Sequence, residues 1–315
     1  MKYGFGIDVG GTTVKLAWFN EEGQLLHKWE IPTVTEGEGK QILEDIAVAV
    51  DGWLNEQKIS REQVLGIGLG VPGPVSRQGV VNRCVNLGWG VFNVEQELSR
   101  LTGLPVKAGN DANVAALGEC WKGGGQGCDN MVLATLGTGV GGGIILDGRI
   151  LYGAHGAAGE IGHLVLNKAE TMPCGCGKYG CAEQYCSATG IVRTARRHLN
   201  RSDRPSSLRS IENLTCKDVF EAAKAGDVVA EEILERVYNH IAEFISDVCC
   251  ATDPDVVVIG GGVSKAGDQL LGGIRRHMHK YIFHAISGVE LRLAQLGNDA
   301  GAYGAFKLIL DEKEA

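Results

Sequence analysis

The chain has 315 residues, of which 44% are hydrophobic and 22% charged, and its formal net charge is -8. This length is enough for a sizeable core and indicates two domains of ordinary size. A mildly acidic chain without blocks of like charge offers no electrostatic footprint for nucleic acid or an anionic membrane, so we expect neither as a partner. A polyanion such as a nucleotide would have to be bound locally, by backbone N–H groups and a metal ion.

The expected location is the cytoplasm. The first residues run directly into a strand pattern instead of a signal peptide, and no stretch reaches the roughly 18 apolar residues that span a bilayer. Ten cysteines in a chain of this size without a secretory signal are expected to be reduced.

The apolar patterns predict alternating strands and helices. The first third is expected to contain strands at 3–9, 13–19, 64–71 and 105–108 and helices at 39–58 and 111–121. The remainder is expected to contain two strands within 131–146, helices at 188–199, 217–224 and 228–250, a buried strand at 255–259 and a final helix at 300–310. Residues 131–146 repeat the strand, glycine turn and strand of the opening, which indicates a diverged internal duplication. The prediction is an α/β fold of two related lobes with mixed sheets, and ligand in the cleft between them.

Two glycine turns are candidate phosphate loops. The first is Asp8-x-Gly10-Gly11-Thr12, and the second begins Gly137-Thr138-Gly139 and runs to residue 143. Phosphate oxygens need several N–H donors in a concave array, and only small residues let the backbone come that close. The threonines add hydroxyl donors, and Asp8 is a candidate Mg²⁺ ligand through water. A single such turn is as often an ordinary tight turn, but two of them with Asp8 before the first favour nucleotide binding.

Asn110 and Asp111 follow a predicted strand and open a predicted helix. Asn and Asp are favoured helix caps, and both roles can coexist. A carboxylate at a strand exit is well placed to accept a proton from a substrate hydroxyl. Because proteins contribute mainly positioning and charge neutralisation to phosphoryl transfer, Asp111 is the candidate catalytic base.

A cysteine cluster has the spacing of a metal site. Cys174, Cys176 and Cys181 lie within eight residues, and His163 precedes the first of them by eleven. Three thiols and an imidazole suit a closed, tetrahedral, structural zinc site. The alternatives are reduced thiols in a flexible loop and a hydrogen-bonded core histidine, and both are less favoured because the ligand types converge in one segment.

These motifs together resemble the ROK sugar kinases, named for repressor, open reading frame and kinase, over nearly the whole chain. The most specific match is Gly159-Glu160-x-Gly162-His163 followed by Cys174-Gly175-Cys176-Gly177-x-x-Gly180-Cys181-x-Glu183. Further matches, in order, are Asp8-x-Gly10-Gly11-Thr12, Gly70-Val71-Pro72-Gly73-Pro74-Val75, Asn110-Asp111 and Leu136-Gly137-Thr138-Gly139-x-Gly141. Residues 183–190 are most similar to bacterial glucokinases, which favours glucose and a place in glycolysis.

The resemblance implies an actin-like ATPase fold of two ribonuclease-H-like lobes, with residues 1–113 plus 300–315 in the small lobe and 114–299 in the large one. It implies ATP-dependent phosphorylation of glucose to glucose 6-phosphate, with Asp111 as general base, Mg²⁺ and structural Zn²⁺. The implied sugar-binding residues are Asn86, Asn110, Asp111, Glu160, His163 and Glu183. The implied zinc ligands are His163, Cys174, Cys176 and Cys181. Gly261 and Gly262 would form the adenosine-binding turn, and a homodimer is common in the family.

Three alternatives stay open at this stage. The first is a kinase for another hexose: N-acetylmannosamine, N-acetylglucosamine, fructose or mannose. The second is a non-catalytic, sugar-sensing regulator, which the early first strand and the acidic charge disfavour because regulators of this family carry an N-terminal DNA-binding domain. The third is an actin-like or chaperone ATPase acting on protein, which the zinc and sugar motifs disfavour.

Overall fold

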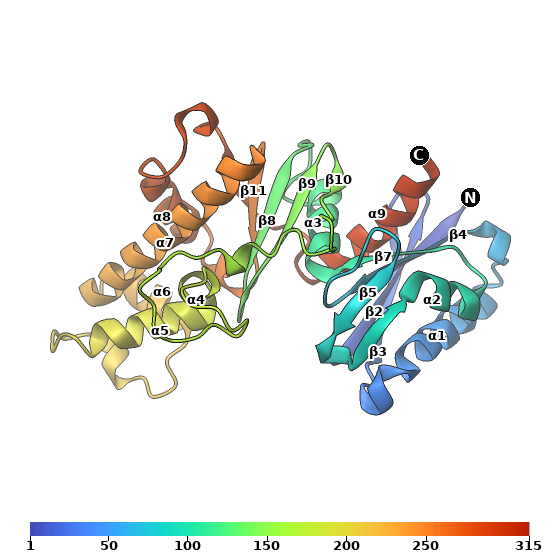
Figure 1. Ribbon diagram of the computed structural model, residues 1–315, viewed down its shortest axis with the longest axis horizontal. Helices are drawn as coiled ribbons and strands as arrows, with labels where there is room; N and C mark the ends of the chain where they lie inside the picture. The colour runs from blue at the N-terminus through green and yellow to red at the C-terminus, as the bar shows by residue number, and fades with distance from the viewer. Residues whose placement is uncertain (315) are drawn as a thin grey trace. The chain divides into compact units, whose positions relative to one another are not determined.

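The computed structural model describes residues 1–314, and their contacts divide the chain into two compact units (Figure 1). The first unit comprises Met1–Asp129, Gly143–Gly159 and Gln295–Ala315, and the second comprises Asn130–Gly142 and Glu160–Ala294. The first unit therefore includes the whole helix that begins at Asp111. The predicted lobe boundary, after residue 113, would instead place most of this helix in the other lobe. The lobe boundaries that the resemblance implies stay a prediction.

The first unit is built on a five-stranded mixed sheet. Its strands are β1 (Tyr3–Val9), β2 (Thr13–Asn20), β3 (Leu25–Pro32), β4 (Val64–Val71) and β7 (Val106–Asn110), in the order β3-β2-β1-β4-β7. The first three strands form an antiparallel meander, and β4 and β7 are parallel to β1. Every residue of β4 is buried, as its continuous apolar sequence predicts for a central strand.

Helices cover both faces of this sheet. On one face, α1 (Gln41–Gln57) and α2 (Val94–Thr102) share a core with the strands, and on the other α9 (Ala300–Glu314) packs on β1 and β4 and contacts α3 (Asp111–Lys122). Gly68 lets the backbone of α9 approach the sheet, since a Cβ there would lie 1.6 Å from the carbonyl oxygen of Ala305. A small hairpin of β5 (Val80–Cys84) and β6 (Trp89–Asn93) completes the unit.

The second sheet repeats the plan of the first. Its strands are β8 (Met131–Leu136), β9 (Val140–Leu146), β10 (Arg149–Ile150), β11 (Val256–Gly260) and β12 (Glu290–Leu293), in the order β10-β9-β8-β11-β12. In this sheet β11 and β12 run parallel to β8, just as β4 and β7 run parallel to β1 in the first sheet. The equivalent strand order supports the internal duplication that the sequence predicts.

The helices of the second unit are α4 (Glu183–Cys186), α5 (Ala188–Leu199), α6 (Cys216–Lys224), α7 (Val228–Thr252) and α8 (Asp268–Met278). The longest, α7, buries one apolar face that includes Ile233, Ile241 and Phe244. Its start is capped by Asp227, whose side chain accepts from the N–H groups of Val229 and Ala230.

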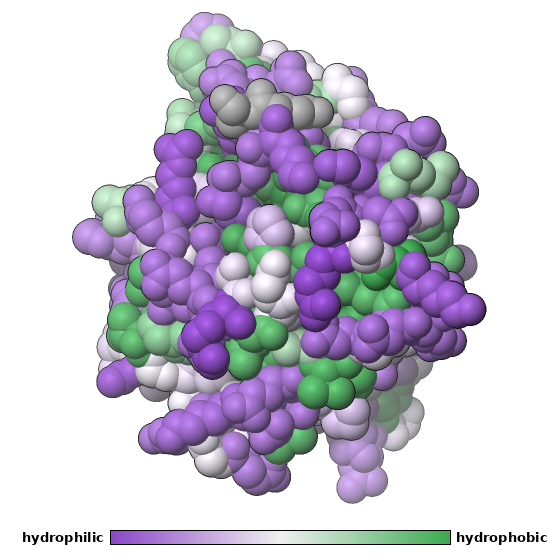
Figure 2. All heavy atoms as spheres, turned by 90° about the vertical axis from the view of Figure 1, so that its right-hand side faces the viewer, coloured by the Kyte–Doolittle hydropathy of each residue, from purple (hydrophilic) through white to green (hydrophobic). Residues whose placement is uncertain are grey.

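On the face of the first unit that Figure 2 presents, hydrophobic side chains form separate patches among hydrophilic ones. Within residues 1–314, no helix combines the length and the apolar character that a membrane span requires.

Candidate active site

Asp8 is the penultimate residue of the first strand and lies beside a cationic neighbour. It lies directly opposite Lys15 in the β1–β2 pairing, and Lys15 Nζ is 3.9 Å from Asp8 Oδ2. Burial raises the pKa of Asp8 to about 6, with Lys15 opposing the shift and the charge of Asp111 adding to it. A bound cation would favour the ionised carboxylate, so the position suits the Mg²⁺ role predicted for it.

The first glycine turn keeps its tip exposed. Gly10 N donates to Thr13 O at 2.9 Å, which closes the turn, whereas Gly11 and Thr12 are exposed. No heavy atom lies within 4 Å of a Cβ built on Gly11. The tip of this turn is therefore open to solvent, and its role as a phosphate loop stays a prediction.

Asn110 and Asp111 occupy the start of α3 as cap and first residue. Asn110 Oδ1 accepts from the N–H groups of Ala112 and Asn113, each at 3.1 Å, and its Nδ2 donates to Asp111 Oδ1 at 2.9 Å. The capping role considered from sequence thus belongs to Asn110. Asp111 Oδ1 also accepts from Ala112 N at 2.8 Å, at the N-terminal end of the helix. Asp111 is half-buried, and its charge contributes to the raised pKa of Asp8. The carboxylates of Asp8 and Asp111 are therefore close enough to interact electrostatically.

Asn86 lies in a short 3₁₀ helix, Val85–Leu87, and is exposed. The preceding thiol, Cys84, accepts from the backbone N–H groups of Leu87 and Asn86, and its pKa is raised by burial and, more weakly, by the charge of Asp111. The segment that carries Asn86 thus lies within electrostatic reach of the predicted base.

Two glycine turns of the second unit lie against each other. Gly137 N donates to Gly139 O at 2.9 Å, and Thr138 is exposed at the tip of that turn. Gly261 follows β11 with φ +81°, and a Cβ there would lie 2.5 Å from the carbonyl oxygen of Leu136. Only glycine fits this close approach. The predicted phosphate loop and the predicted adenosine turn, including the exposed Gly262, are therefore neighbours at one end of the second sheet.

Glu183 joins the phosphate loop to the cysteine cluster. Its Oε2 accepts from Val140 N at 3.0 Å, and its Oε1 lies 3.6 Å from Cys174 Sγ. A Cβ on Gly139 would approach the same carboxylate to 2.3 Å. The residue predicted as a sugar ligand therefore also fixes the position of the loop, a role that sequence spacing does not reveal.

Glu160 and His163 bracket one 3₁₀ turn. Glu160 precedes the turn Ile161–His163, and its Oε2 lies 3.9 Å from His163 Nε2. The other ring nitrogen of His163, Nδ1, lies 3.9 Å from Cys174 Sγ. The imidazole therefore presents one nitrogen to the thiols and the other to a carboxylate, which is the common arrangement of a metal-bound histidine.

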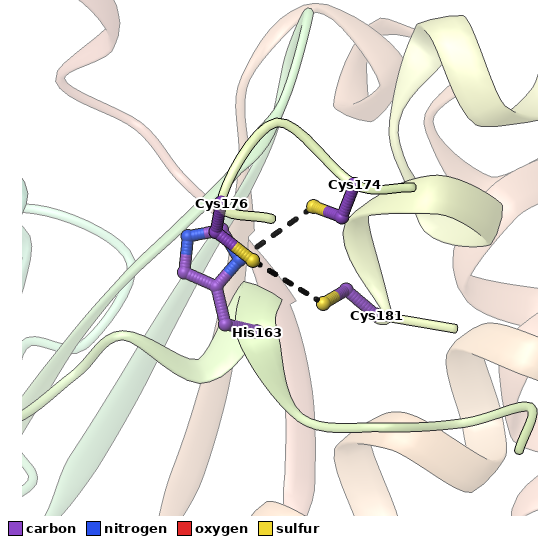
Figure 3. A group of neighbouring side chains, drawn as sticks. All are labelled: His163, Cys174, Cys176 and Cys181. Atoms are coloured by element: carbon purple, nitrogen blue, oxygen red, sulfur yellow. Dashed lines mark hydrogen bonds between the residues drawn. The ribbon is translucent and has the colours of Figure 1, made fainter. Parts of the chain in front are cut away.

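The four predicted metal ligands converge (Figure 3). The ligand atoms of His163, Cys174, Cys176 and Cys181 all lie within 4.8 Å of one another, and Cys176 Sγ is 3.7 Å from Cys181 Sγ. Zinc–sulfur bonds of about 2.3 Å in a tetrahedron place two sulfurs about 3.8 Å apart, so the donor set fits zinc. Burial raises the pKa of Cys181 to about 12, and a divalent cation would offset this cost of the thiolate.

Lys15 and Glu170 were not identified from sequence as parts of the site. Lys15 is the cross-strand neighbour of Asp8, and the alternation of β2 alone does not distinguish it from a solvated lysine. Glu170 is buried beside Arg197 and receives the hydroxyl of Tyr185 at 2.7 Å, just before the cysteine loop. Its partners Arg193, Arg197 and Tyr185 lie 15 to 27 residues away along the chain, so only the fold reveals its role.

Two mixed sheets with equivalent strand order, each with a glycine turn after its first strand, are those of the actin-like ATPase fold. The ROK family model matches residues 4–312. A glucokinase of Halalkalibacterium halodurans is 44% identical over 98% of this chain and 96% of its own length. The chain belongs to the ROK family, as the sequence motifs predict.

Two solved structures show the same similarity. A ROK family glucokinase of Streptomyces griseus, solved with glucose and AMPPNP, is 32% identical with a TM-score of 0.74, over 97% of this chain and 98% of that one. A ROK family transcriptional regulator, a homolog of the E. coli MLC protein, is 26% identical with a TM-score of 0.85, over 98% of this chain and 78% of that one. The fold is thus shared by catalytic and regulatory members.

Proposed function

We propose that the protein is an ATP-dependent hexokinase that phosphorylates glucose to glucose 6-phosphate, with Asp111 as the general base. The observation that carries the proposal is the position of Asp111 at the start of α3, in the electrostatic environment of Asp8 and next to the cap Asn110. The relatives give the substrate: a glucokinase is 44% identical over nearly the full length, and a solved relative is described in complex with glucose.

In the proposed reaction, Asp111 accepts the proton of the sugar hydroxyl while the oxygen of that hydroxyl attacks the γ-phosphorus of ATP in line. The bond from the γ-phosphorus to the β,γ-bridging oxygen breaks, and ADP leaves. The exposed N–H groups of the Gly10–Thr12 and Gly137–Gly139 turns hold phosphate oxygens. Mg²⁺ held near Asp8 would supply charge neutralisation on the phosphates. The turn at Gly261 and Gly262 contacts the adenosine.

The sugar is held by a set of polar side chains. These are Asn86, Asn110, Asp111, Glu160, His163 and Glu183. His163 Nε2 points toward Glu160 and can donate to a hydroxyl when Nδ1 faces the metal side. Polar groups that pair with the sugar hydroxyls discriminate against sugars that lack them, which makes this set the proposed source of specificity.

A structural zinc ion held by His163, Cys174, Cys176 and Cys181 belongs to the proposal. It would fix the loop that delivers Glu183, because Cys174 and Glu183 are already in contact. No part of the chemistry passes through it. The homodimer and the cytoplasmic location stay predictions.

The test is ADP release with ATP, Mg²⁺ and a panel of glucose, mannose, fructose, N-acetylglucosamine and N-acetylmannosamine. We expect glucose to be preferred, and Asp111→Asn to lose several orders of magnitude in turnover while glucose binding, measured by calorimetry, largely survives. Preference for another sugar would correct only the specificity. Near-normal turnover of the Asn variant would remove Asp111 from the base role, and no activity on any sugar by folded, metal-loaded protein would refute the kinase function.

A further inference from the structure

A hollow of about 820 Å³ lies on the second unit, away from the glycine turns, lined by α5, the segment after it, and α7. Its charged side chains other than histidine are Arg197, Arg201, Arg204, Arg236, Glu232 and Glu235. Four arginines against two glutamates make this surface positive, although the chain as a whole carries a net charge of -8. The hollow also has the size of an ordinary small-molecule site.

The two carboxylates in the hollow already have cationic partners. Arg204 Nη1 donates to both oxygens of Glu232 at 2.8 Å, and His198 Nε2 lies 3.5 Å from the same carboxylate. Glu235 pairs with Arg276 of α8 at 2.7 Å. Both glutamates are thus already paired, although Glu232 also interacts electrostatically with Arg236.

Arg201 and Arg236 are the cations that remain. Both are exposed, and within residues 1–314 neither forms an ion pair, although both line the same hollow. Because Glu232 already pairs through both oxygens with Arg204, it only partly offsets the charge of Arg236, and a dianion bound by both guanidinium groups would supply the missing negative charge. Guanidinium matches phosphate in bidentate geometry, and the hydroxyls of Thr194 and Ser202 line the hollow as neutral donors.

We propose that this hollow is a binding site for a small phosphate ester, held by Arg201 and Arg236 and separate from the catalytic residues. The proposal concerns a second site, so it does not depend on which sugar the enzyme phosphorylates. Its occupant carries a phosphate dianion on a body of sugar size, because the hollow is far larger than a phosphate ion alone.

The hollow is connected to the cysteine loop by a chain of hydrogen bonds. Arg197 lines the hollow and donates to Glu170 from Nη1 at 2.9 Å and from Nη2 at 3.1 Å. Glu170 in turn accepts from the N–H of Met172 at 3.1 Å, two residues before Cys174. An anion that draws Arg197 toward the hollow competes with Glu170 for it, so occupancy of the hollow changes the hydrogen bonding of residues 170–172.

The test is calorimetric titration with glucose 6-phosphate and, separately, with inorganic phosphate, on wild type and on Arg201→Gln/Arg236→Gln. The matched control is Arg77→Gln/Arg149→Gln, which removes the same charge from exposed positions of the first unit. Repeating the titration at saturating glucose, which occupies the sugar site proposed above, separates product binding there from binding in the hollow. We expect the hollow variant to weaken a sugar phosphate site at least tenfold, and the control variant and saturating glucose to leave that site unchanged.

Two further measurements protect the test against a misfolded variant. Arg201→Lys/Arg236→Lys should recover part of the affinity, because charge is kept and only the bidentate geometry is lost. Hydrogen exchange of residues 167–174 should change on adding glucose 6-phosphate to wild type and not to the Gln variant. Equal affinity of wild type and a folded Gln variant, or the absence of any site beyond the catalytic one, would overturn the proposal even if glucose kinase activity is confirmed.

Discussion

Replacing Glu119 by glutamine tests whether this buried carboxylate holds the first unit together. Glu119 is only 1% exposed and lies near the end of α3. Its Oε2 accepts from Gly124 N at 2.8 Å, and its Oε1 accepts from Leu296 N at 2.8 Å. Gln295 N, at 3.1 and 3.0 Å, is shared by both oxygens. One side chain thus fixes the segment after α3 and the segment where the chain re-enters the first unit at Gln295.

The magnitude follows from the number of donors. Glutamine keeps one acceptor oxygen and has an NH₂ group in place of the other. This NH₂ group faces at least one buried backbone N–H, which then lacks an acceptor, at a cost of about 1–3 kcal/mol. The remaining bonds lose their charge assistance, which costs about 1 kcal/mol more. The lower desolvation cost of a neutral side chain offsets part of this. We expect Glu119→Gln to lower the free energy of unfolding of the first unit by about 3 kcal/mol.

Tryptophan fluorescence in a urea titration isolates this effect, because all five tryptophans lie between residues 18 and 121 and therefore in the first unit. The control is Glu56→Gln, the same substitution at an exposed position of α1, which should stay within about 0.5 kcal/mol of wild type. If the two variants unfold at the same urea concentration, the reasoning that the carboxylate's charge-assisted bonds hold these segments is wrong.

Three further predictions concern Asp8, Glu170 and the cysteine cluster. Burial raises the pKa of Asp8 from 3.8 to about 6, so the folded state binds more protons than the unfolded state between these values, and the stability of the protein falls as pH rises through this window. Asp8→Asn should therefore be more stable than wild type at pH 7 by up to about 3 kcal/mol and should lose that advantage below pH 4, measured by thermal unfolding without magnesium. A hydrogen bond from Arg197 lowers the pKa of Glu170 well below its usual range; burial opposes this shift, and a hydrogen bond from Tyr185 adds to it. The stability that Glu170 contributes is therefore present at neutral pH and is lost in acid. Glu170→Gln should cost about 3 kcal/mol of unfolding free energy at pH 7 and clearly less at pH 3, and a cost that does not change with pH would contradict this. Zinc removal by a chelator, or Cys176→Ser, should lower both thermal stability and glucose affinity, and unchanged glucose binding by metal-free protein would count against a metal-fixed position of Glu183.

The sequence predicts strongly periodic elements better than marginal ones. The strands at Tyr3–Val9 and Val64–Val71 and the helix at Ala188–Leu199 have the predicted bounds, because each has a clear apolar pattern and a clear boundary. The edge strand β3 was not predicted, since most of its residues are exposed or half-buried and its apolar alternation is weak. Helix α8 was not predicted because Gly272 and Gly273 interrupt its apolar pattern. Gly273 is nevertheless required there, as a Cβ would meet the ring of Tyr238 at 2.5 Å.

The candidate site divides in the same way between local and tertiary signals. Glycine turns and cysteine spacing are local features, so the sequence alone predicts the two loops and the convergence of His163 with the three thiols. The second role of Glu183, which ties the phosphate loop to Cys174, depends on which backbone N–H its carboxylate meets, and spacing along the chain carries no such information.

Glu119 shows why this limit is physical. From sequence it is one acidic residue in a helix, for which an exposed position is the default. Its three N–H donors come from Gly124 and from residues 295 and 296, far away along the chain, and only they make a buried carboxylate tolerable. Asp111, at the other end of the same helix, is proposed as the base from a short local motif, Asn110-Asp111 at the start of α3. Candidate reactive residues can therefore be proposed from sequence, whereas the contacts that hold a buried carboxylate in place are found only when the distant partners are known.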